Sequence, residues 1–418
     1  MLKSFRFLSL LVRGYIPPPQ SYEISAPRSV DIELRLGKGV IEVYARVSQH
    51  RGHLWINPGL RPVEGIASQD IVPDPDTSIV RVRRVEPSGP RMRLVGRVAR
   101  LFSEEGSYID KHVLRATALW YPGVGGSSIL CTAYMAEHEA ATLFVEKRGF
   151  DVASSLPLKS ESGISMEFRG SGRAFLVEVV ALRDASIARK CVEGVDVRMI
   201  MSRGSGASVS DLEAALAAAI DFYRSLDLEM PFSSMDLVIA DTWSFTSGRM
   251  LVINSSLARY KTPLLLSIVH GLAHVWWLGF IKPASPEDVW LFEAVPEYLT
   301  TISLAKFGLT QLHQKRLNEV FKEALRKIPS PLYTPPNRVF IAVRKGKDSS
   351  WRRVGEALLH MVGACIGTPN MLRSIAEEMR MGVASTTVYR LSWRSFFSKL
   401  AQYGPVEGVL KRFRMSIS

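Results

Sequence analysis

Cysteine is scarce in this chain. The 418 residues include three cysteines, Cys131, Cys191 and Cys365, and no two of them form a Cys-x-x-Cys pair. A small, odd number of scattered cysteines argues against the disulfide framework of a small secreted domain and indicates a reducing compartment. The apolar run at residues 7–12 is too short for an ordinary signal peptide. We therefore expect a cytoplasmic protein.

Acidic residues are fewer than basic ones. The chain has 40 Asp and Glu against 53 Lys and Arg, a formal net charge of +13. Seven arginines fall in one stretch of twenty residues: Arg81, Arg83, Arg84, Arg91, Arg93, Arg97 and Arg100. If they share a face they would bind anions or nucleic acid. The alternative is that they are outward-facing residues of antiparallel strands, and no recognised nucleic-acid motif accompanies them.

The chain also lacks an uninterrupted apolar run of membrane length. Residues 262–281 come nearest, flanked by Lys261 and Lys282. His270, Gly271 and His274 lie in the middle of this run, at the depth where polar groups are most costly in a bilayer. A buried helix that carries a functional site explains both the apolar residues and the histidines. We therefore expect no membrane partner.

The first half of the chain is strand-like. Residues 30–36 alternate between apolar and polar side chains, and residues 40–47 largely do the same. Turn-forming clusters such as residues 87–90 separate these and further β-rich runs. Many short strands with such turns predict an N-terminal β-sandwich of two antiparallel sheets over residues 1–201.

The pattern changes after a glycine- and serine-rich connector at residues 202–207. Ser210 and Glu213 form a capping box that opens a helix. Apolar runs at residues 235–240 and 250–254 predict buried strands, and Thr262 and Pro263 predict the start of the next helix. The remainder is mostly helical. We therefore predict a multi-domain α and β protein with a second domain over residues 208–418.

Three residues stand at a spacing that zinc hydrolases use. His270 and His274 are four residues apart, so a helix places both imidazoles on one face. Glu293 follows after eighteen further residues and would come from the next helix. Three such ligands leave a fourth position on zinc open, which is the catalytic arrangement. The spacing predicts one zinc ion; the alternative is a pair of core histidines satisfied by hydrogen bonds.

The residue after the first histidine is unusual for such a site. That position normally holds the glutamate that acts as general base. Here it is Gly271, which has no side chain to accept a proton. A glycine within a helix costs about 1 kcal/mol relative to alanine. Close approach of another chain segment or of a ligand would be a structural reason to keep it.

Further matches flank the motif, at residues 231–238, 275–277, 289–298 and 355–361. With them the chain resembles the aminopeptidase N and leukotriene hydrolase family of zinc metallopeptidases (gluzincins), whose pattern is His-Glu-x-x-His-x18-Glu. The resemblance implies a saddle-like β-domain followed by a thermolysin-like, mostly helical domain. It implies that His270, His274 and Glu293 hold zinc.

The same resemblance exposes three departures. The family's general base maps to Gly271, and the glutamate that anchors the substrate's amino group maps to Leu251. The tyrosine that stabilises the oxyanion maps to Arg352. Arg249 and Glu297 are the candidates for contacts with a substrate. The resemblance thus implies an aminopeptidase-like protein that binds zinc but is impaired as a peptidase.

Two alternatives stay open at this point. The first is a working zinc hydrolase with an unconventional base, for which the candidates are Asp241, Glu287, Asp288, Glu297 and Glu356. The second is a scaffold that binds nucleic acid or protein through the basic surface. The chain ends at Ser418, before the family's large C-terminal helical domain, so we expect an open cleft for a peptide or protein ligand.

Overall fold

A computed structural model of the chain gives the fold. It describes residues 29–37, 40–48, 53–57, 59–73, 81–96, 108–109, 113–116, 120, 140–171, 177–284, 288, 290–327, 350–386, 388–413 and 415. The apolar run at residues 7–12 and Glu287 lie outside these ranges.

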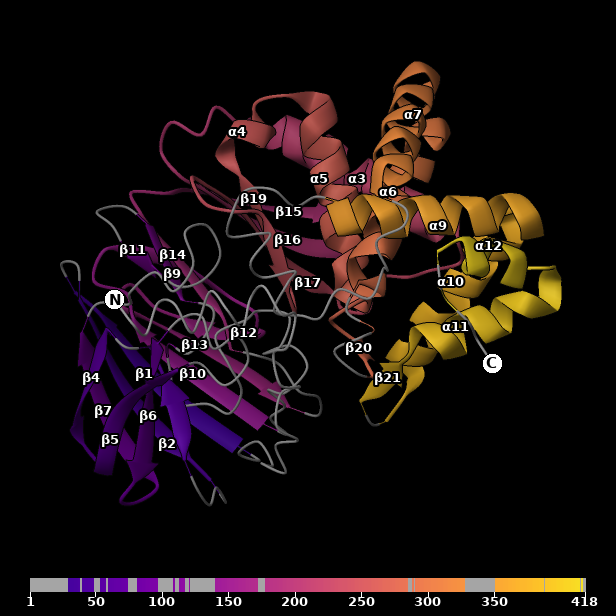
Figure 1. The fold of residues 1–418 in the computed structure, drawn as a ribbon. Coiled ribbons are helices and arrows are strands. Elements are labelled where there is room, and N and C mark those ends of the chain that lie inside the picture. Colours follow the sequence, from indigo (N-terminus) through magenta and orange to yellow (C-terminus); the bar gives the residue numbers. More distant parts are fainter. Residues whose placement is uncertain are drawn as a thin grey trace.

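Strands make up most of the described chain up to residue 201, drawn from indigo to magenta in Figure 1. One sheet of seven described strands has the order β12 (Leu158–Glu161), β13 (Ser165–Ser171), β10 (Ala140–Glu146), β1 (Ser29–Leu36), β2 (Ile41–Val47), β7 (Arg91–Gly96) and β4 (Leu60–Glu64). A second contains β11 (Phe150–Ser154), β14 (Val179–Arg183), β9 (Val113–Ala116) and β8 (Tyr108–Ile109). A third contains β3 (Leu54–Ile56), β6 (Arg81–Pro87) and β5 (Ile66–Pro73).

The predicted sandwich of purely antiparallel sheets is wrong in one respect. Strands β1 and β10 pair in parallel, with Ile32 opposite Leu143. More than a hundred residues separate these two positions, so the chain has room to cross over and enter the sheet in the same direction. The alternation in β1 is as expected, because Ile32, Leu34 and Leu36 are buried in the core of this region.

A five-stranded sheet links the β-rich region to the helices. Its order is β15 (Ser186–Val192), β16 (Val195–Met201), β17 (Ser234–Ala240), β19 (Met250–Asn254) and β18 (Phe245–Ser247). Strand β16, expected to end the first domain, pairs in parallel with β17, with Ile200 opposite Val238. The predicted boundary at residue 201 therefore falls inside this sheet. The connector at residues 202–207 marks a turn between β16 and the next helix, and a turn does not reveal which strands pair.

Helices dominate the rest of the described chain and gather together, coloured from rose through orange to yellow, in Figure 1. They are α3 (Val209–Arg224), α4 (Ser255–Ala258), α5 (Lys261–Trp276), α6 (Leu291–Lys306), α7 (Thr310–Lys327), α9 (Ser350–Ile366), α10 (Thr368–Ala384), α11 (Trp393–Leu400) and α12 (Glu407–Arg412). A 3₁₀ turn, η2 (Ala401–Tyr403), follows α11, and two short strands, β20 (Ile281–Pro283) and β21 (Tyr389–Leu391), pair in parallel.

Two helix starts differ from the prediction. Ser208, rather than Ser210, caps α3, because its hydroxyl accepts a hydrogen bond from the Asp211 backbone N–H at 3.0 Å. Helix α5 begins at Lys261 after Tyr260, without a side-chain cap, and Pro263 lies in its first turn. Proline fits there because the first N–H groups of a helix have no partner within it.

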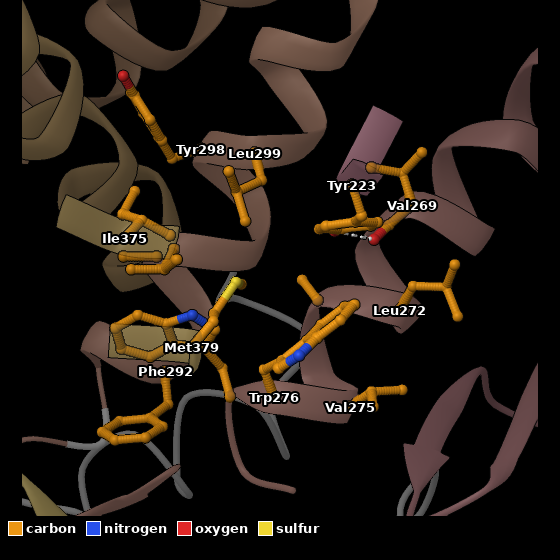
Figure 2. Close-up of a cluster of buried hydrophobic side chains, with 14 of the residues drawn as sticks. Tyr223, Val269, Leu272, Val275, Trp276, Phe292, Tyr298, Leu299, Ile375 and Met379 are labelled. Carbon is orange, nitrogen blue, oxygen red and sulfur yellow. Dashed lines mark hydrogen bonds between the residues drawn. The ribbon is translucent and has the colours of Figure 1, made fainter. Parts of the chain in front are cut away.

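Helix α5 lies in the centre of the helical part and is apolar on several sides. Figure 2 shows its Val269, Leu272, Val275 and Trp276 in the buried cluster that also contains Tyr223 of α3. The Tyr223 hydroxyl donates a 2.7 Å hydrogen bond to the Val269 carbonyl. Within the described part of the chain, no helix is long and apolar enough to cross a membrane.

Candidate metal centre

His270, His274 and Glu293 come together in the fold. Helix α5 carries both histidines one turn apart, and the first turn of α6 supplies Glu293. The two imidazole Nε2 atoms are 3.1 Å apart, and Glu293 Oε2 is 3.8 Å from each of them. In the part of the chain that the structure describes, they form the one group of three or more potential metal-ligating side chains with mutually close donor atoms.

A backbone carbonyl orients one of the two rings. His274 Nδ1 lies 3.2 Å from the Trp277 carbonyl oxygen. That oxygen can only accept, so Nδ1 carries the proton and the Nε2 lone pair points toward His270 and Glu293. The tight turn that ends α5 places this carbonyl. Gly279 makes the turn possible, because a Cβ there would lie 1.7 Å from the Val275 carbonyl oxygen.

The three donors suit a zinc ion. Two ligand atoms at about 2.0–2.2 Å from one tetrahedral ion lie roughly 3.3–3.6 Å apart. The observed separations of 3.1 and 3.8 Å bracket that range. Two imidazoles and one carboxylate are the ligand set of several catalytic zinc sites. The hydrogen bond from His274 Nδ1 to Trp277 is also the outer partner that a zinc-binding histidine normally has.

A tertiary contact explains Gly271. A Cβ at this position would lie 2.3 Å from Leu251 Cδ1 and 3.1 Å from Thr246 Oγ1. Leu251 is on β19 and Thr246 is opposite it on β18, so the two-stranded β18–β19 unit packs directly against this turn of α5. The Thr246 hydroxyl also donates a 2.8 Å hydrogen bond to the Gly271 carbonyl. Close packing of another chain segment therefore disfavours a side chain at this position.

Leu251 is involved in two of the departures from the family's pattern, those at the amino-group anchor and at the general base. The resemblance placed it where the family's amino-group anchor belongs, and the structure packs it against the position of the missing base. It is 1% exposed. The space beside the first histidine is thus filled by a hydrocarbon side chain that has no proton-transfer chemistry.

The described candidates for a replacement base are engaged elsewhere or exposed. Glu297 pairs with Arg316 of α7, and Glu356 is fully buried and accepts a hydrogen bond from Thr301. Asp288 accepts a 2.8 Å hydrogen bond from the Trp393 backbone N–H. Asp241 lies exposed just beyond the end of β17. None of these four belongs to the close group formed by His270, His274 and Glu293.

Arg249 and Arg352 are the two further candidate site residues. Arg249 precedes β19, and its guanidinium donates to Ser234 Oγ at 2.9 Å beside a cavity that none of the three metal-ligating residues lines. Arg352 lies in the first turn of α9, and its side chain is outside the described part of the structure. Sequence reasoning missed Thr246, whose contact with Gly271 bridges 25 positions of the chain and leaves no local signal.

Comparison with known proteins adds one finding about the fold. No family model matches the sequence. No curated protein matches it either. Among solved structures, the chain is similar to the crystal structure of an aminopeptidase N family protein from Idiomarina loihiensis, with a TM-score of 0.67 and 15% identity. The likeness covers 93% of this chain and 77% of that one. The two chains share a fold.

Proposed function

We propose that this chain is an aminopeptidase-like protein that holds one zinc ion through His270, His274 and Glu293 and does not hydrolyse peptides at an ordinary rate. The observation that carries the proposal is the contact between Gly271 and Leu251. It occupies the space beside the donor cluster where a general base would have to stand. Proton transfer by a positioned base contributes about 10² to 10⁴ in rate, and neither side chain supplies it.

Each residue of the site has a defined part in this proposal. His274 binds through Nε2, since its Nδ1 proton is committed to the Trp277 carbonyl. His270 and the buried Glu293 complete the ligand set. When bound, zinc supplies Lewis acidity and lowers the pKa of a coordinated water. Bound metal also stabilises the fold, because it binds only where the three ligands are assembled.

The ligand that we propose is a peptide or protein segment rather than nucleic acid. Within the arginine-rich stretch, Arg84 pairs with Asp70 across β5 and β6, and Arg93 pairs with Glu42. Arg93 also pairs with Glu64. Carboxylate partners reduce the positive charge that these arginines offer to a phosphate backbone. Binding to DNA or RNA that weakens steeply with salt would favour the nucleic-acid alternative instead.

Activity assays on the zinc-loaded protein test the proposal. With fluorogenic aminoacyl substrates, we expect no turnover above that of the His270→Ala variant. Turnover of about 1 s⁻¹ or more, lost on zinc chelation and in His270→Ala, would contradict the proposal. Such a result would mean that a carboxylate from elsewhere in the chain serves as the base.

Restoring the carboxylate should not restore the activity. In Gly271→Glu the new Cβ would lie 2.3 Å from Leu251 Cδ1, so this buried side chain must move before the carboxylate can take up a base position. We expect a gain far below the roughly 10² to 10⁴ that a general base gives an intact site, because catalytic groups act as a unit. The measurement is kcat/KM for Gly271→Glu and for Gly271→Glu with Leu251→Ala, each with zinc content checked. A gain of 10² or more from Gly271→Glu alone would contradict the steric argument.

A further inference from the structure

The structure contains a cavity that lies away from the metal centre. It has a volume of about 520 Å³, within the usual range of small-molecule sites. Its walls come from the segment at residues 154–158, from β15 and β16, and from the beginning of β17 and the turn before β19. The side chains that carry the argument are Arg198, Asp236, Ser234 and Arg249.

This cavity and the metal centre lie on opposite faces of the five-stranded sheet. Leu251 and Ile253 of β19 pack with α5 in one core cluster. Ile200 of β16 and Val238 of β17 pack with residues of the β-rich region in another. Alternation along a strand puts Arg198 on the same face as Ile200, and Asp236 on the same face as Val238. The cavity therefore faces the β-rich region, and the histidines belong to the other side.

Arg249 has no carboxylate partner among the described residues. Its guanidinium donates to the neutral Ser234 hydroxyl at 2.9 Å and lies over the Phe232 ring, 5.3 Å from the centroid. Among the residues that the structure describes, it forms no ion pair with a carboxylate. Burial lowers the pKa of Arg249, because the charge loses water and gains no acid in exchange. A guanidinium has five N–H donors in a planar fork suited to an oxyanion.

The other cations that line the cavity have carboxylate partners. Arg198 is buried and pairs with Asp236 through two hydrogen bonds, at 2.8 and 2.6 Å. At the rim, Arg189 pairs with Glu161, and Lys190 lies 3.6 Å from Glu213. Asp196 is an exposed acid on the same rim. Among the described residues that line the cavity, Arg249 is thus the cation that has no carboxylate partner.

The wall formed by residues 154–158 is attached to the backbone of Arg249 and is partly apolar. The Arg249 backbone N–H donates to the Ser155 carbonyl at 3.3 Å. Gly248 next to it has φ +53°, and a Cβ there would lie 2.4 Å from the same oxygen. This contact holds Leu156, Pro157 and Leu158 at the cavity. A ligand with an apolar group beside its negative charge could therefore contact both the Arg249 guanidinium and these apolar side chains.

We propose that this cavity binds a small molecule that carries a carboxylate or phosphate group beside an apolar group, with its oxyanion held by Arg249. The site is separate from the metal centre and does not depend on zinc. The attraction between the oxyanion and the Arg249 guanidinium is stronger in a partly buried cavity than on the surface, because less water screens the two charges.

Calorimetric titration with benzoate and with phenyl phosphate tests the proposal. At constant ionic strength, we expect saturable binding of at least one probe at one site per chain, and the better probe distinguishes carboxylate from phosphate. Arg249→Met should weaken binding at least tenfold. Arg380→Met, which removes an equal charge from the exposed face of α10, should change it less than twofold. His274→Ala should bind as the wild type does.

Three results would overturn the proposal. They are the absence of saturable binding for both probes, equal effects of Arg249→Met and Arg380→Met, and loss of binding in His274→Ala, which would place the anion on the metal. If Arg249→Met does not fold, the same titration of the Asp196→Asn variant tests the proposal instead. Removing this acid from the rim should tighten binding several-fold, and unchanged or weaker binding would contradict the site.

Discussion

Gly271 stands where the pattern His-Glu-x-x-His has glutamate, and another part of the chain packs closely against it. A glycine within a helix is normally a cost of about 1 kcal/mol relative to alanine. Here the space for a side chain is taken by Leu251, which is buried and 2.3 Å from the position of a Cβ. The two residues are therefore a matched pair, and their substitutions should not be additive.

A double-mutant cycle measures this coupling. Gly271→Ala alone should destabilise the protein by about 1–2 kcal/mol, since overpacking outweighs the gain in helix propensity. Leu251→Ala alone should cost about 2–5 kcal/mol. In the Leu251→Ala background, Gly271→Ala should become neutral or stabilising. Urea unfolding of the four proteins is the measurement, and simple additivity of the two costs would contradict the contact.

The close grouping of His270 and His274 with Glu293 could be predicted from the sequence, and the partner of Gly271 could not. His270 and His274 are four positions apart, and helix geometry alone brings them together. Leu251 lies twenty positions before Gly271, so their contact depends on how β19 packs against α5. The sequence does mark Arg198 as unusual, because it is the one cation in the largely apolar strand β16. Its partner Asp236 is on another strand and could not be assigned from spacing.

At the scale of elements, a buried polar cluster joins three helices. Glu356 of α9 is fully buried, accepts a hydrogen bond from Thr301 of α6 and lies 3.4 Å from Arg316 of α7. Arg316 pairs in addition with Glu297 of α6. Buried charges of this kind are stable only as a set, because each loses its water.

Removing Glu356 should therefore weaken the packing of all three helices. We expect Glu356→Ala to cost about 3 kcal/mol, the lower end for breaking a buried pair, since Arg316 keeps Glu297. Glu319→Ala, on the exposed side of α7, should change the free energy of unfolding by less than about 0.5 kcal/mol. Chemical denaturation compares the two variants. Equal values would mean that the cluster does not stabilise the fold.

Long periodic elements were predictable, and their partners were not. The sequence predicted a mostly helical remainder of the chain, and the helices α6, α7, α9 and α10 lie there. Strand β16 was expected in the β-sandwich, because its own residues do not distinguish one neighbouring strand from another. The strands β20 and β21 were missed, since three residues are too few to show a period.

At the scale of the whole molecule, a sheet-rich region precedes a helical one, and the five-stranded sheet joins them (Figure 1). The fold is similar to that of an aminopeptidase N family protein, with which this chain shares 15% sequence identity. Fold alone does not carry activity, which depends on the groups at the site. The sequence predicted the order of the two regions, whereas the cavity beside Arg249 depends on segments that only the fold brings together.

Metal analysis of the purified protein tests the central claim most directly. After reconstitution with zinc and removal of the excess, the wild type should retain about one zinc ion per chain, because three ligands are already assembled. His274→Ala should retain little, and His53→Ala, which removes an exposed histidine outside the site, should match the wild type. A wild type that retains no zinc, or a His274→Ala variant that retains as much as the wild type, would contradict the account.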